Sequence, residues 1–457
     1  MRIALVALTP QPDEASAAFH WPNYGIRRIQ AAVAAAPGLE AEVELLELPV
    51  ERARSQGGVE EAADRVEALD PDVIGFSAYV WSFPTQVELA RVLKERDPRR
   101  TVVFGGPSAR PSMFDLPPYR GANRFVDAIV VREGEESFRE LASLPARDPE
   151  GLAGVPGLAV PSNGGWRETP AREPIESLDR IDSPYQLGLM PRRSMAYLET
   201  FRGCPLTCSF CEWGVKESAR RVFGVEYLVR ELEAFAALNA PGVVLLDAGL
   251  NLNARAFANL AAAEEQVGFF ADRVLIAEVY PSHLTDEHLR FLERVRTAYV
   301  GIGLQSFDPA VLKGLERPFD EARFRRVIDE MAPRMPVEVQ VILGLPGDNP
   351  RSFRQTLERA LELPCSVRVY HCLVLPDALL TRGGPEFEMR FRYDDLKMTS
   401  CLGWPEEELR ETARWVDALA ESGRGVAGDF WWAFSGGEGV NRIEYPIEVG
   451  AVPRARR

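Results

Sequence analysis

Short apolar runs alternate with segments of helical spacing over the first 145 residues of the chain. The apolar runs have the length of buried strands and lie at residues 2–8, 41–48, 73–77, 101–104 and 128–131. Apolar residues at helical spacing separate them at residues 25–35, 58–69 and 84–96. This alternation predicts an α/β fold with a doubly wound, Rossmann-like parallel sheet over residues 1–145. Ligands of such sheets bind at the carboxyl ends of the strands.

A second alternating block covers residues 191–382. Its first strand is expected near residues 195–200, and five more are expected at 243–246, 274–278, 298–304, 337–343 and 367–373. Helical segments separate them, for example at 225–238, 286–295 and 319–331. Six strand–helix units predict a partial (β/α)6 barrel of TIM type, with its active site at the carboxyl ends of the strands.

Two further regions flank this block. Residues 146–190 are rich in Pro and Gly and are interpreted as a linker with a small hairpin near 157–167. Residues 383–457 are expected to form an α-rich C-terminal cap with a helix at 405–421. We interpret the aromatic run at 430–434 as packing within that cap, although an aromatic substrate could also stack there.

Composition narrows the classes of function. The 457 residues hold 53 Lys and Arg against 68 Asp and Glu, a net charge of −15. This balance argues against nucleic-acid binding and against a polybasic membrane anchor. No apolar run approaches the ~18 residues that span a bilayer, and the apolar start at residues 2–8 fits a buried strand better than a signal peptide. We expect a soluble cytoplasmic protein.

The six cysteines fall into two groups. Cys204, Cys208 and Cys211 lie within eight residues of sequence, and the others are Cys365, Cys372 and Cys401. A structural zinc site or a ferredoxin cluster needs four protein ligands, and the nearest histidine downstream is His283. Three thiolates leave one iron of a cluster open to an external ligand. The alternatives are a buried trio without metal and, for the second group, either core packing or a redox role.

The spacing Cys-x3-Cys-x2-Cys, with Phe210 before the last cysteine, resembles the signature of the radical S-adenosylmethionine (SAM) superfamily. The resemblance implies a [4Fe-4S] cluster on the three thiolates, an open iron that chelates SAM, and Phe210 near the adenine. Residues 301–306 resemble the family's fourth strand, so Gln305 and Ser306 would face SAM, and Arg317 resembles the arginine that follows. Residues 341–347, with Leu345, resemble the fifth-strand segment that contacts adenine.

The order of the two blocks resembles the cobalamin-binding class of this superfamily. Matching stretches lie at residues 21–26, 74–77, 105–108 and 133–135. The resemblance implies cobalamin contacts from Ser77, Tyr79, Val80, Trp81, Gly105, Gly106, Pro107, Ser108, Glu133, Gly134 and Glu135. The Asp-x-His-x-x-Gly loop of many cobalamin domains is missing, and His20 is interpreted as a surface residue. Cobalamin would then bind base-off without a histidine ligand, above residues 79–81. A nucleotide-binding or ligand-free flavodoxin-like domain is the alternative.

The resemblance implies methyl transfer from SAM through methylcobalamin to a carbon of a small molecule or peptide in secondary metabolism. Cobalamin-dependent radical SAM methyltransferases, among them a tryptophan-methylating enzyme of thiopeptide biosynthesis, have this activity. Catalytic candidates are Glu278, as the counterpart of an acidic residue near the cluster, with Asp247 and Tyr280. An external electron donor such as flavodoxin or ferredoxin is the expected partner, with neither nucleic acid nor membrane.

Three alternative functions remain open. The first is a rearrangement, cyclisation or ring contraction without a methyl gain. The second is a cobalamin carrier without enzymatic activity. The third is methylthiolation of tRNA, against which the net charge of −15 and the lack of a further cysteine trio argue.

Overall fold

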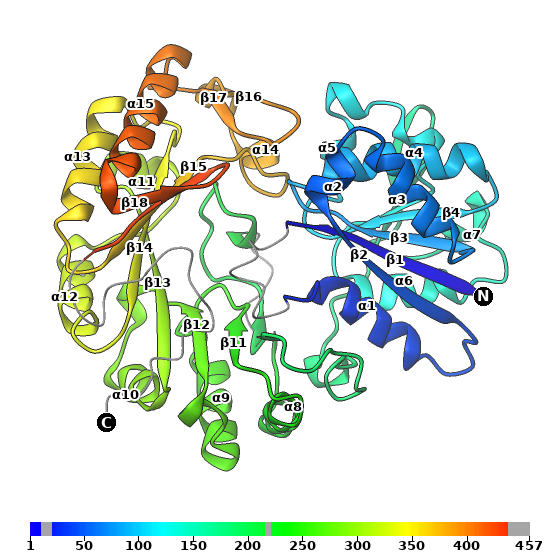
Figure 1. The fold of residues 1–457 in the computed structure, drawn as a ribbon, viewed down its shortest axis with the longest axis horizontal. Helices are drawn as coiled ribbons and strands as arrows, with labels where there is room; N and C mark the ends of the chain where they lie inside the picture. The colour runs from blue at the N-terminus through cyan, green and yellow to red at the C-terminus, as the bar shows by residue number, and fades with distance from the viewer. Residues whose placement is uncertain (11–20, 215–220, 437–457) are drawn as a thin grey trace. The chain divides into compact units, whose positions relative to one another are not determined.

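A computed structural model describes residues 1–10, 21–214 and 221–436 of the chain (Figure 1). His20 lies outside the described residues. The described chain forms two compact units, which are treated separately. The first holds residues 1–10, 22–190 and 393–395, and the second holds residue 21 with residues 191–214, 221–392 and 396–436. No helix among the described residues is both long and apolar enough to cross a membrane.

The first unit is built on a seven-stranded sheet with the order β2-β1-β3-β4-β5-β6-β7. Its first five strands are parallel and are β1 (Arg2–Thr9), β2 (Glu42–Pro49), β3 (Val73–Ser77), β4 (Thr101–Gly105) and β5 (Ala128–Val130). Its helices are α1 (Tyr24–Ala34), α2 (Val50–Arg54), α3 (Gly58–Glu67), α4 (Phe83–Arg96), α5 (Pro111–Phe114), α6 (Gly134–Ala142) and α7 (Pro149–Ala153). The predicted doubly wound sheet is confirmed.

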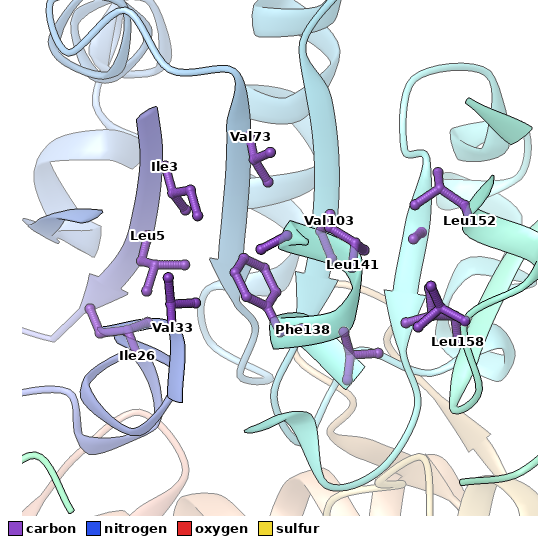
Figure 2. Packing of buried hydrophobic residues seen from close by; sticks show 14 of the residues in the cluster. Ile3, Leu5, Ile26, Val33, Val73, Val103, Phe138, Leu141, Leu152 and Leu158 are labelled. Carbon is purple, nitrogen blue, oxygen red and sulfur yellow. The ribbon is translucent and has the colours of Figure 1, made fainter. Parts of the chain in front are cut away.

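The core of this unit shows why these segments fold as they do. Strand β1 is buried along almost its whole length, and α1 begins at Asn23, whose side chain accepts a hydrogen bond from the Ile26 amide at 3.2 Å. Figure 2 shows Leu5, Ile26 and Phe138 among the side chains of this core. A Cβ at Gly75 on β3 would lie 2.7 Å from the Leu5 side chain, so the absent side chain lets Leu5 and Phe138 pack against the sheet.

Residues 146–190, which we predicted as a linker, belong to the first compact unit. The hairpin expected near 157–167 is present as β6 (Leu158–Ser162) and β7 (Gly165–Glu168). Strand β6 pairs antiparallel with β5, so the hairpin extends the parallel sheet. The region therefore adds to a core at one sheet edge. The predicted domain bounds themselves stay predictions.

The second unit contains an eight-stranded sheet with the order β18-β19-β15-β14-β13-β12-β11-β8. The six parallel strands are β8 (Ala196–Leu198), β11 (Gly242–Leu245), β12 (Val274–Glu278), β13 (Thr297–Gln305), β14 (Val337–Leu343) and β15 (Ser366–His371). A short ribbon of β9 (Phe201–Arg202) and β10 (Arg221–Val222) accompanies them. Six parallel strands agree with the six expected strand–helix units, and the (β/α)6 barrel geometry itself stays a prediction.

Helices connect these strands and cover them. They are α8 (Val225–Ala237), α9 (Ala254–Val267), α10 (Asp286–Arg294), α11 (Pro309–Gly314), α12 (Glu321–Met331), α13 (Pro350–Leu361) and α14 (Leu379–Arg382). Most begin at a capping side chain; for example, Asn253 accepts hydrogen bonds from the amides of Arg255 and Ala256, the second and third residues of α9. The caps at Asn253, Asp308 and Asn349 lie in the turns that follow β11, β13 and β14, which gives these helices defined starting points at the carboxyl ends of the strands.

The C-terminal region differs from the α-rich cap that we predicted. It contains α15 (Glu406–Leu419), near the expected helix, but also β16 (Arg390–Phe391), β17 (Met398–Ser400), β18 (Gly425–Ala427) and β19 (Trp431–Phe434). The aromatic run at 430–434 is mainly strand β19, which pairs antiparallel with β15. Aromatic residues favour strands, and a four-residue strand is too short to show a clear period.

Candidate cofactor and active site

A cavity of about 230 Å³ lies at the carboxyl ends of the parallel strands of the second unit. Asp247 follows β11, Glu278 ends β12 and Gln305 ends β13. Its walls are formed by Cys204, Leu206, Cys208, Phe210, Cys211, Trp213, Asp247, Ala248, Leu252, Glu278, Val279, Tyr280, Gly303, Gln305, Arg317 and Gln340. This is the end of the sheet at which barrel enzymes build active sites.

Nine of the predicted residues line this cavity. They are Cys204, Cys208, Cys211, Phe210, Asp247, Glu278, Tyr280, Gln305 and Arg317. Ser306 and Leu345 do not line it. Ser306 is fully buried and accepts a hydrogen bond from the Asp308 amide at 3.1 Å, and Leu345 is fully buried below Trp404, whose indole donates to the Leu345 carbonyl. Contact of these two residues with SAM stays a prediction.

The three cysteines all line the cavity. Cys204 and Cys208 are buried, and Cys211 is partly buried. Burial raises the pKa of the Cys211 thiol to about 11 and also raises the pKa of Cys204. Within residues 1–10, 21–214 and 221–436, no three His, Cys, Asp or Glu side chains converge closely enough for a single metal ion. Three cysteine thiols that line one cavity provide the type of donor that holds an iron–sulfur cluster.

Asp247 fixes the start of the cysteine loop. Its buried carboxylate accepts hydrogen bonds from the Thr200 amide at 2.8 Å, from the Thr200 hydroxyl, and from the Phe201 amide at 3.4 Å. Burial outweighs these bonds and raises its pKa to about 7. The geometry therefore shows a carboxylate that holds the backbone just before Cys204, and its catalytic role stays a prediction.

Glu278 lies directly over Gly301 of the neighbouring strand. A Cβ at position 301 would be 2.2 Å from the Glu278 carboxylate, so only glycine leaves room for it. Gln340 on β14 donates a hydrogen bond to Glu278 Oε1 at 2.8 Å. Burial, with the negative charge of Glu338, raises the pKa of Glu278. A buried carboxyl in a cavity is suited to hold or transfer a proton.

Gln340 lines the cavity but was not predicted as a site residue from the sequence. It stands in a strand of sequence Val-Glu-Val-Gln-Val-Ile-Leu, in which Glu338 and Gln340 alternate with apolar residues. Polar residues at alternating positions of a buried strand were the available signal. Arg368 of β15 pairs with Glu338 at 2.9 Å, so the same face of the sheet continues as a polar network.

Gln305 and Arg317 supply unsatisfied polar groups to the cavity. Neither Gln305 Oε1 nor Arg317 Nε has a hydrogen-bond partner among the described residues, although both are buried. A Cβ at Gly303 would approach both side chains to within 3 Å, which explains the glycine at that position. Arg317 also donates to the Gly303 carbonyl and lies 5.5 Å above the ring of Tyr280. Buried polar atoms without partners fit a bound polar ligand such as SAM.

Arg317 also approaches the cysteine loop itself. Its Nη1 lies 3.8 Å from Cys208 Sγ. The Tyr280 hydroxyl donates to the Pro318 carbonyl, which orients the ring beside the guanidinium. One cation therefore faces a metal-ligand candidate, an aromatic ring and the cavity at the same time.

At the strand ends of the first unit, the groups available to a ligand are main-chain atoms and small side chains. Gly106 has a φ of +97°, and a Cβ there would lie 2.8 Å from the Ala78 carbonyl. The Ala78 amide donates to the Gly105 carbonyl at 2.7 Å, and the Ser108 amide donates to the Ala78 carbonyl at 3.0 Å. The ends of β3 and β4 are thus held together by their main chains.

The other predicted cobalamin contacts lie in the turns around these strand ends. Tyr79 and Trp81 stack with ring centroids 4.6 Å apart, and the buried Trp81 Nε1 has no partner among the described residues. The exposed Gly106 in one turn and the unpaired indole N–H of Trp81 in another fit a ligand with polar substituents. The remaining predicted contacts are partly or fully buried, except the exposed Pro107, and comprise Ser77, Val80, Ser108, Glu133, Gly134 and Glu135. Their contact with a ligand stays a prediction.

Two protein-family models match the chain. The B12 binding domain matches residues 13–142, and the radical SAM superfamily matches residues 198–360. The chain therefore belongs to the radical SAM superfamily. Within it, the chain belongs to the class that carries a cobalamin-binding domain ahead of the radical SAM domain.

Curated relatives agree with this placement. The chain is 34% identical over 345 residues to 2-(S-pantetheinyl)-carbapenam-3-carboxylate methyltransferase of Streptantibioticus cattleyicolor. It is 31% identical over 344 residues to the cobalamin-dependent radical SAM methyltransferase TokK of Streptomyces tokunonensis. Each match covers 70% of this chain and 49% of the relative. The chain thus spans about half the length of these curated relatives.

Solved structures share the fold. The radical SAM methyltransferase TsrM from Kitasatospora setae, with cobalamin and a [4Fe-4S] cluster bound, matches with a TM-score of 0.64 at 17% identity, over 92% of this chain and 90% of that one. The cobalamin-dependent enzyme OxsB, with aqua-cobalamin and SAM bound, matches with a TM-score of 0.61 at 15% identity, over 92% and 61% of the two chains. At these identities the likeness concerns the fold.

Proposed function

We propose that the protein is a cobalamin-dependent radical SAM methyltransferase that methylates a carbon atom of a small-molecule or peptide substrate. The observation that carries the proposal is the cavity of the second unit, where three cysteine thiols meet buried polar groups without partners. The matched family models support it, and so do the two methyltransferases among the curated relatives.

The chain's own residues have distinct tasks in this proposal. Cys204, Cys208 and Cys211 hold a [4Fe-4S] cluster. Arg317 and Gln305 bind the polar groups of SAM, since a guanidinium and an amide match a carboxylate and an amine. When bound, the cluster and the cobalamin supply the electron and the transferable methyl group, and an external donor such as flavodoxin or ferredoxin supplies reducing power.

Cobalamin binding is proposed for residues 1–145 and SAM binding for residues 191–382. The exposed turn at Gly106 and the unpaired Trp81 N–H support the first part. No Asp-x-His-x-x-Gly motif occurs in the sequence, so we propose a base-off cofactor without a histidine ligand.

Glu278 is the proposed proton-handling group of the site. Its carboxyl lines the cavity, and burial raises its pKa, so it can keep or accept a proton at a pH where an exposed glutamate is ionised. Gln340 orients it through a hydrogen bond, and Gly301 leaves room for it. Tyr280 is fixed beside Arg317 and is proposed as a substrate-facing wall.

The test is anaerobic reconstitution with iron, sulfide and hydroxocobalamin, followed by incubation with SAM that carries a labelled methyl group and a chemical reductant. We expect cobalamin uptake, formation of methylcobalamin and S-adenosylhomocysteine, and label in the product. A carbapenam carboxylate is the first acceptor to try, because one relative is a 2-(S-pantetheinyl)-carbapenam-3-carboxylate methyltransferase. Products without added label would favour a rearrangement or ring contraction. A protein that takes up no cobalamin would contradict the proposal.

A further inference from the structure

Arg382 contacts the cysteine loop from outside the cavity. It is the last residue of α14, which follows the last parallel strand of the second unit. Its guanidinium donates to the carbonyls of Thr207 at 3.3 Å, Cys208 at 3.0 Å, and Cys211. Its Nε donates to the Asp377 carbonyl at 2.9 Å, which ties the same side chain to its own segment.

Among the described residues, the loop has few other backbone hydrogen bonds that could fix its shape. Cys211 donates its amide to the Cys208 carbonyl at 3.1 Å, and Ser209 donates to the Leu315 carbonyl at 3.1 Å. Carbonyl groups in a buried loop need donors, and a guanidinium presents several N–H groups in a rigid fork. One arginine can therefore satisfy three carbonyls that no regular element serves. A lysine has a single donating atom and cannot cover the same spread.

Two of the three carbonyls belong to cysteines that the site needs. The orientation of a peptide carbonyl fixes the local backbone, and the backbone sets the direction of the Cα–Cβ bond. Holding the Cys208 and Cys211 carbonyls toward Arg382 therefore constrains where their thiols point. Both thiols line the cavity. Arg382 does not line it, and it lies beyond the 198–360 segment that the superfamily model matches.

We propose that Arg382 is a positioning residue for the iron–sulfur cluster. It clamps the backbone of residues 207–211 so that two of the three thiols face the cavity, and its positive charge beside the loop favours the reduced, more negative state of a cluster. The inference rests on the proposed cluster, and it assigns a role to a residue from the C-terminal part of the unit. Groups that orient metal ligands from behind usually affect metal retention strongly.

The experiment compares Arg382→Gln and Arg382→Lys with the unchanged chain after anaerobic reconstitution. We expect Arg382→Gln to retain iron about 10–100-fold less well against a chelator, the range typical of groups that orient metal ligands. Arg382→Lys keeps the positive charge but loses the forked guanidinium. Its iron retention should therefore lie between that of Arg382→Gln and that of the unchanged chain. The midpoint potential of the cluster, measured by a redox titration followed by electron paramagnetic resonance, should become more negative in Arg382→Gln than in Arg382→Lys.

Arg323→Gln is the matched control. Arg323 on α12 also clamps backbone carbonyls of a loop, donating to Leu284 at 2.7 Å and to Pro281 at 3.4 Å, but it does not touch the cysteine loop. Its iron retention and cluster potential should equal those of the unchanged chain. Equal losses of iron in Arg323→Gln and Arg382→Gln would overturn the inference, as would normal iron retention and potential in Arg382→Gln.

Thermal unfolding of the metal-free proteins separates positioning from folding. If Arg382→Gln unfolds below the reconstitution temperature, Arg382→Lys decides the matter: weaker iron retention at an unchanged melting temperature supports the inference, and full retention overturns it. An unchanged chain that binds no cluster would overturn the proposed function itself. Normal cluster binding by the unchanged chain, together with normal iron retention and potential in Arg382→Gln, would overturn only this inference.

Discussion

The two proposed cofactor regions differ in the groups that they present: mainly side chains in the second unit, and mainly main chain in the first. The second unit gathers thiols, carboxyls, an amide and a guanidinium around one cavity, and each has an identifiable neighbour or an unsatisfied atom. The first unit offers strand ends held by main-chain hydrogen bonds, a glycine at φ +97° and a stacked aromatic pair. A site made of side chains depends on residue chemistry. A site made of backbone depends on the absence of side chains.

The largest expected effect tests the side-chain site. Replacing Cys204 by Ala should remove one of three thiolates, so the iron content after reconstitution should fall to background and SAM turnover should cease. Cobalamin uptake by the first unit should stay normal, because its proposed contacts do not include Cys204. Iron analysis and the absorbance of bound cobalamin measure both outcomes on the same sample.

Cys365→Ala is the control for that experiment. Cys365 is fully buried and belongs to the second group of cysteines, so the change costs packing but removes no proposed ligand. Its iron content should equal that of the unchanged chain. Loss of iron from Cys365→Ala, or normal iron in Cys204→Ala, would contradict the separation into two groups of cysteines.

The next effect tests the backbone site. Gly106→Ala places a Cβ 2.8 Å from the Ala78 carbonyl at a φ of +97°, so the turn between β4 and Ser108 must shift. Left-handed strain alone costs of order 1–3 kcal/mol, and the clash adds to it. We expect weaker cobalamin binding, measured by absorbance titration, together with a lower free energy of unfolding in urea.

Gly164→Ala isolates the strain from the clash. Gly164 lies in the β6–β7 turn at a φ of +82°, and a Cβ there would meet nothing within 4 Å. It should lose stability by about 1 kcal/mol and bind cobalamin normally. Equal cobalamin affinities in both variants would show that the turn at Gly106 does not shape the site.

These two regions also differ in how far the sequence could predict them. The cysteine spacing predicted three residues that the structure places at one cavity, and their role as metal ligands stays a prediction. The glycine turn at 105–108 was predicted as a cobalamin contact only through family resemblance. Gln340 and Arg382 were missed, since one is a single amide in a buried strand and the other acts on carbonyls far away in sequence.

The fold shows the same contrast. Parallel strands separated by capped helices give long periodic signals, and the predicted sheets of both units are present. The aromatic run at 430–434 was not predicted as a strand, because so short a run carries no readable period and its partner β15 lies far away in sequence. Pairing of distant segments is a tertiary effect that local patterns do not encode.

A smaller effect concerns the pH dependence of stability. The pKa of Asp247 is raised to about 7 in the folded protein from an ordinary value near 4, so unfolding releases a proton between these values and the native state loses stability as the pH rises from about 4 to 7. Asp247→Asn should remove up to about 1.4 kcal/mol of this loss per pH unit. Urea unfolding of the metal-free protein at pH 5 and pH 7 measures the difference.

The exposed Asp272 provides the comparison for this measurement. Asp272→Asn should leave the difference between the two pH values as it is in the unchanged chain. If Asp247→Asn also leaves it unchanged, the buried carboxyl does not hold a proton in the native state, and its hydrogen bonds from Thr200 must outweigh burial.

The smallest expected effect concerns Gln340. Gln340→Leu removes the hydrogen bond that stabilises the ionised form of Glu278, so the pKa of Glu278 should rise further. A hydrogen bond of about 1 kcal/mol net corresponds to a shift of less than about one pH unit. The pH profile of product formation should move toward alkaline pH by that amount, whereas Gln266→Leu on the exposed face of α9 should not move it. If the pH profile of Gln340→Leu does not move, Glu278 is not the group that handles the proton.

The antiparallel strands β18 and β19 also affect how the second unit can fold. Strand β15 is hydrogen-bonded to β19 along Val367–Tyr370, although residues 372–430 separate the two strands. During synthesis, β15 emerges with one open edge and keeps it until residues 431–434 have left the ribosome. An exposed strand edge is a site for pairing with another chain. Heterologous expression should therefore be most sensitive to aggregation in this interval, and slower growth at lower temperature should raise the yield of folded protein.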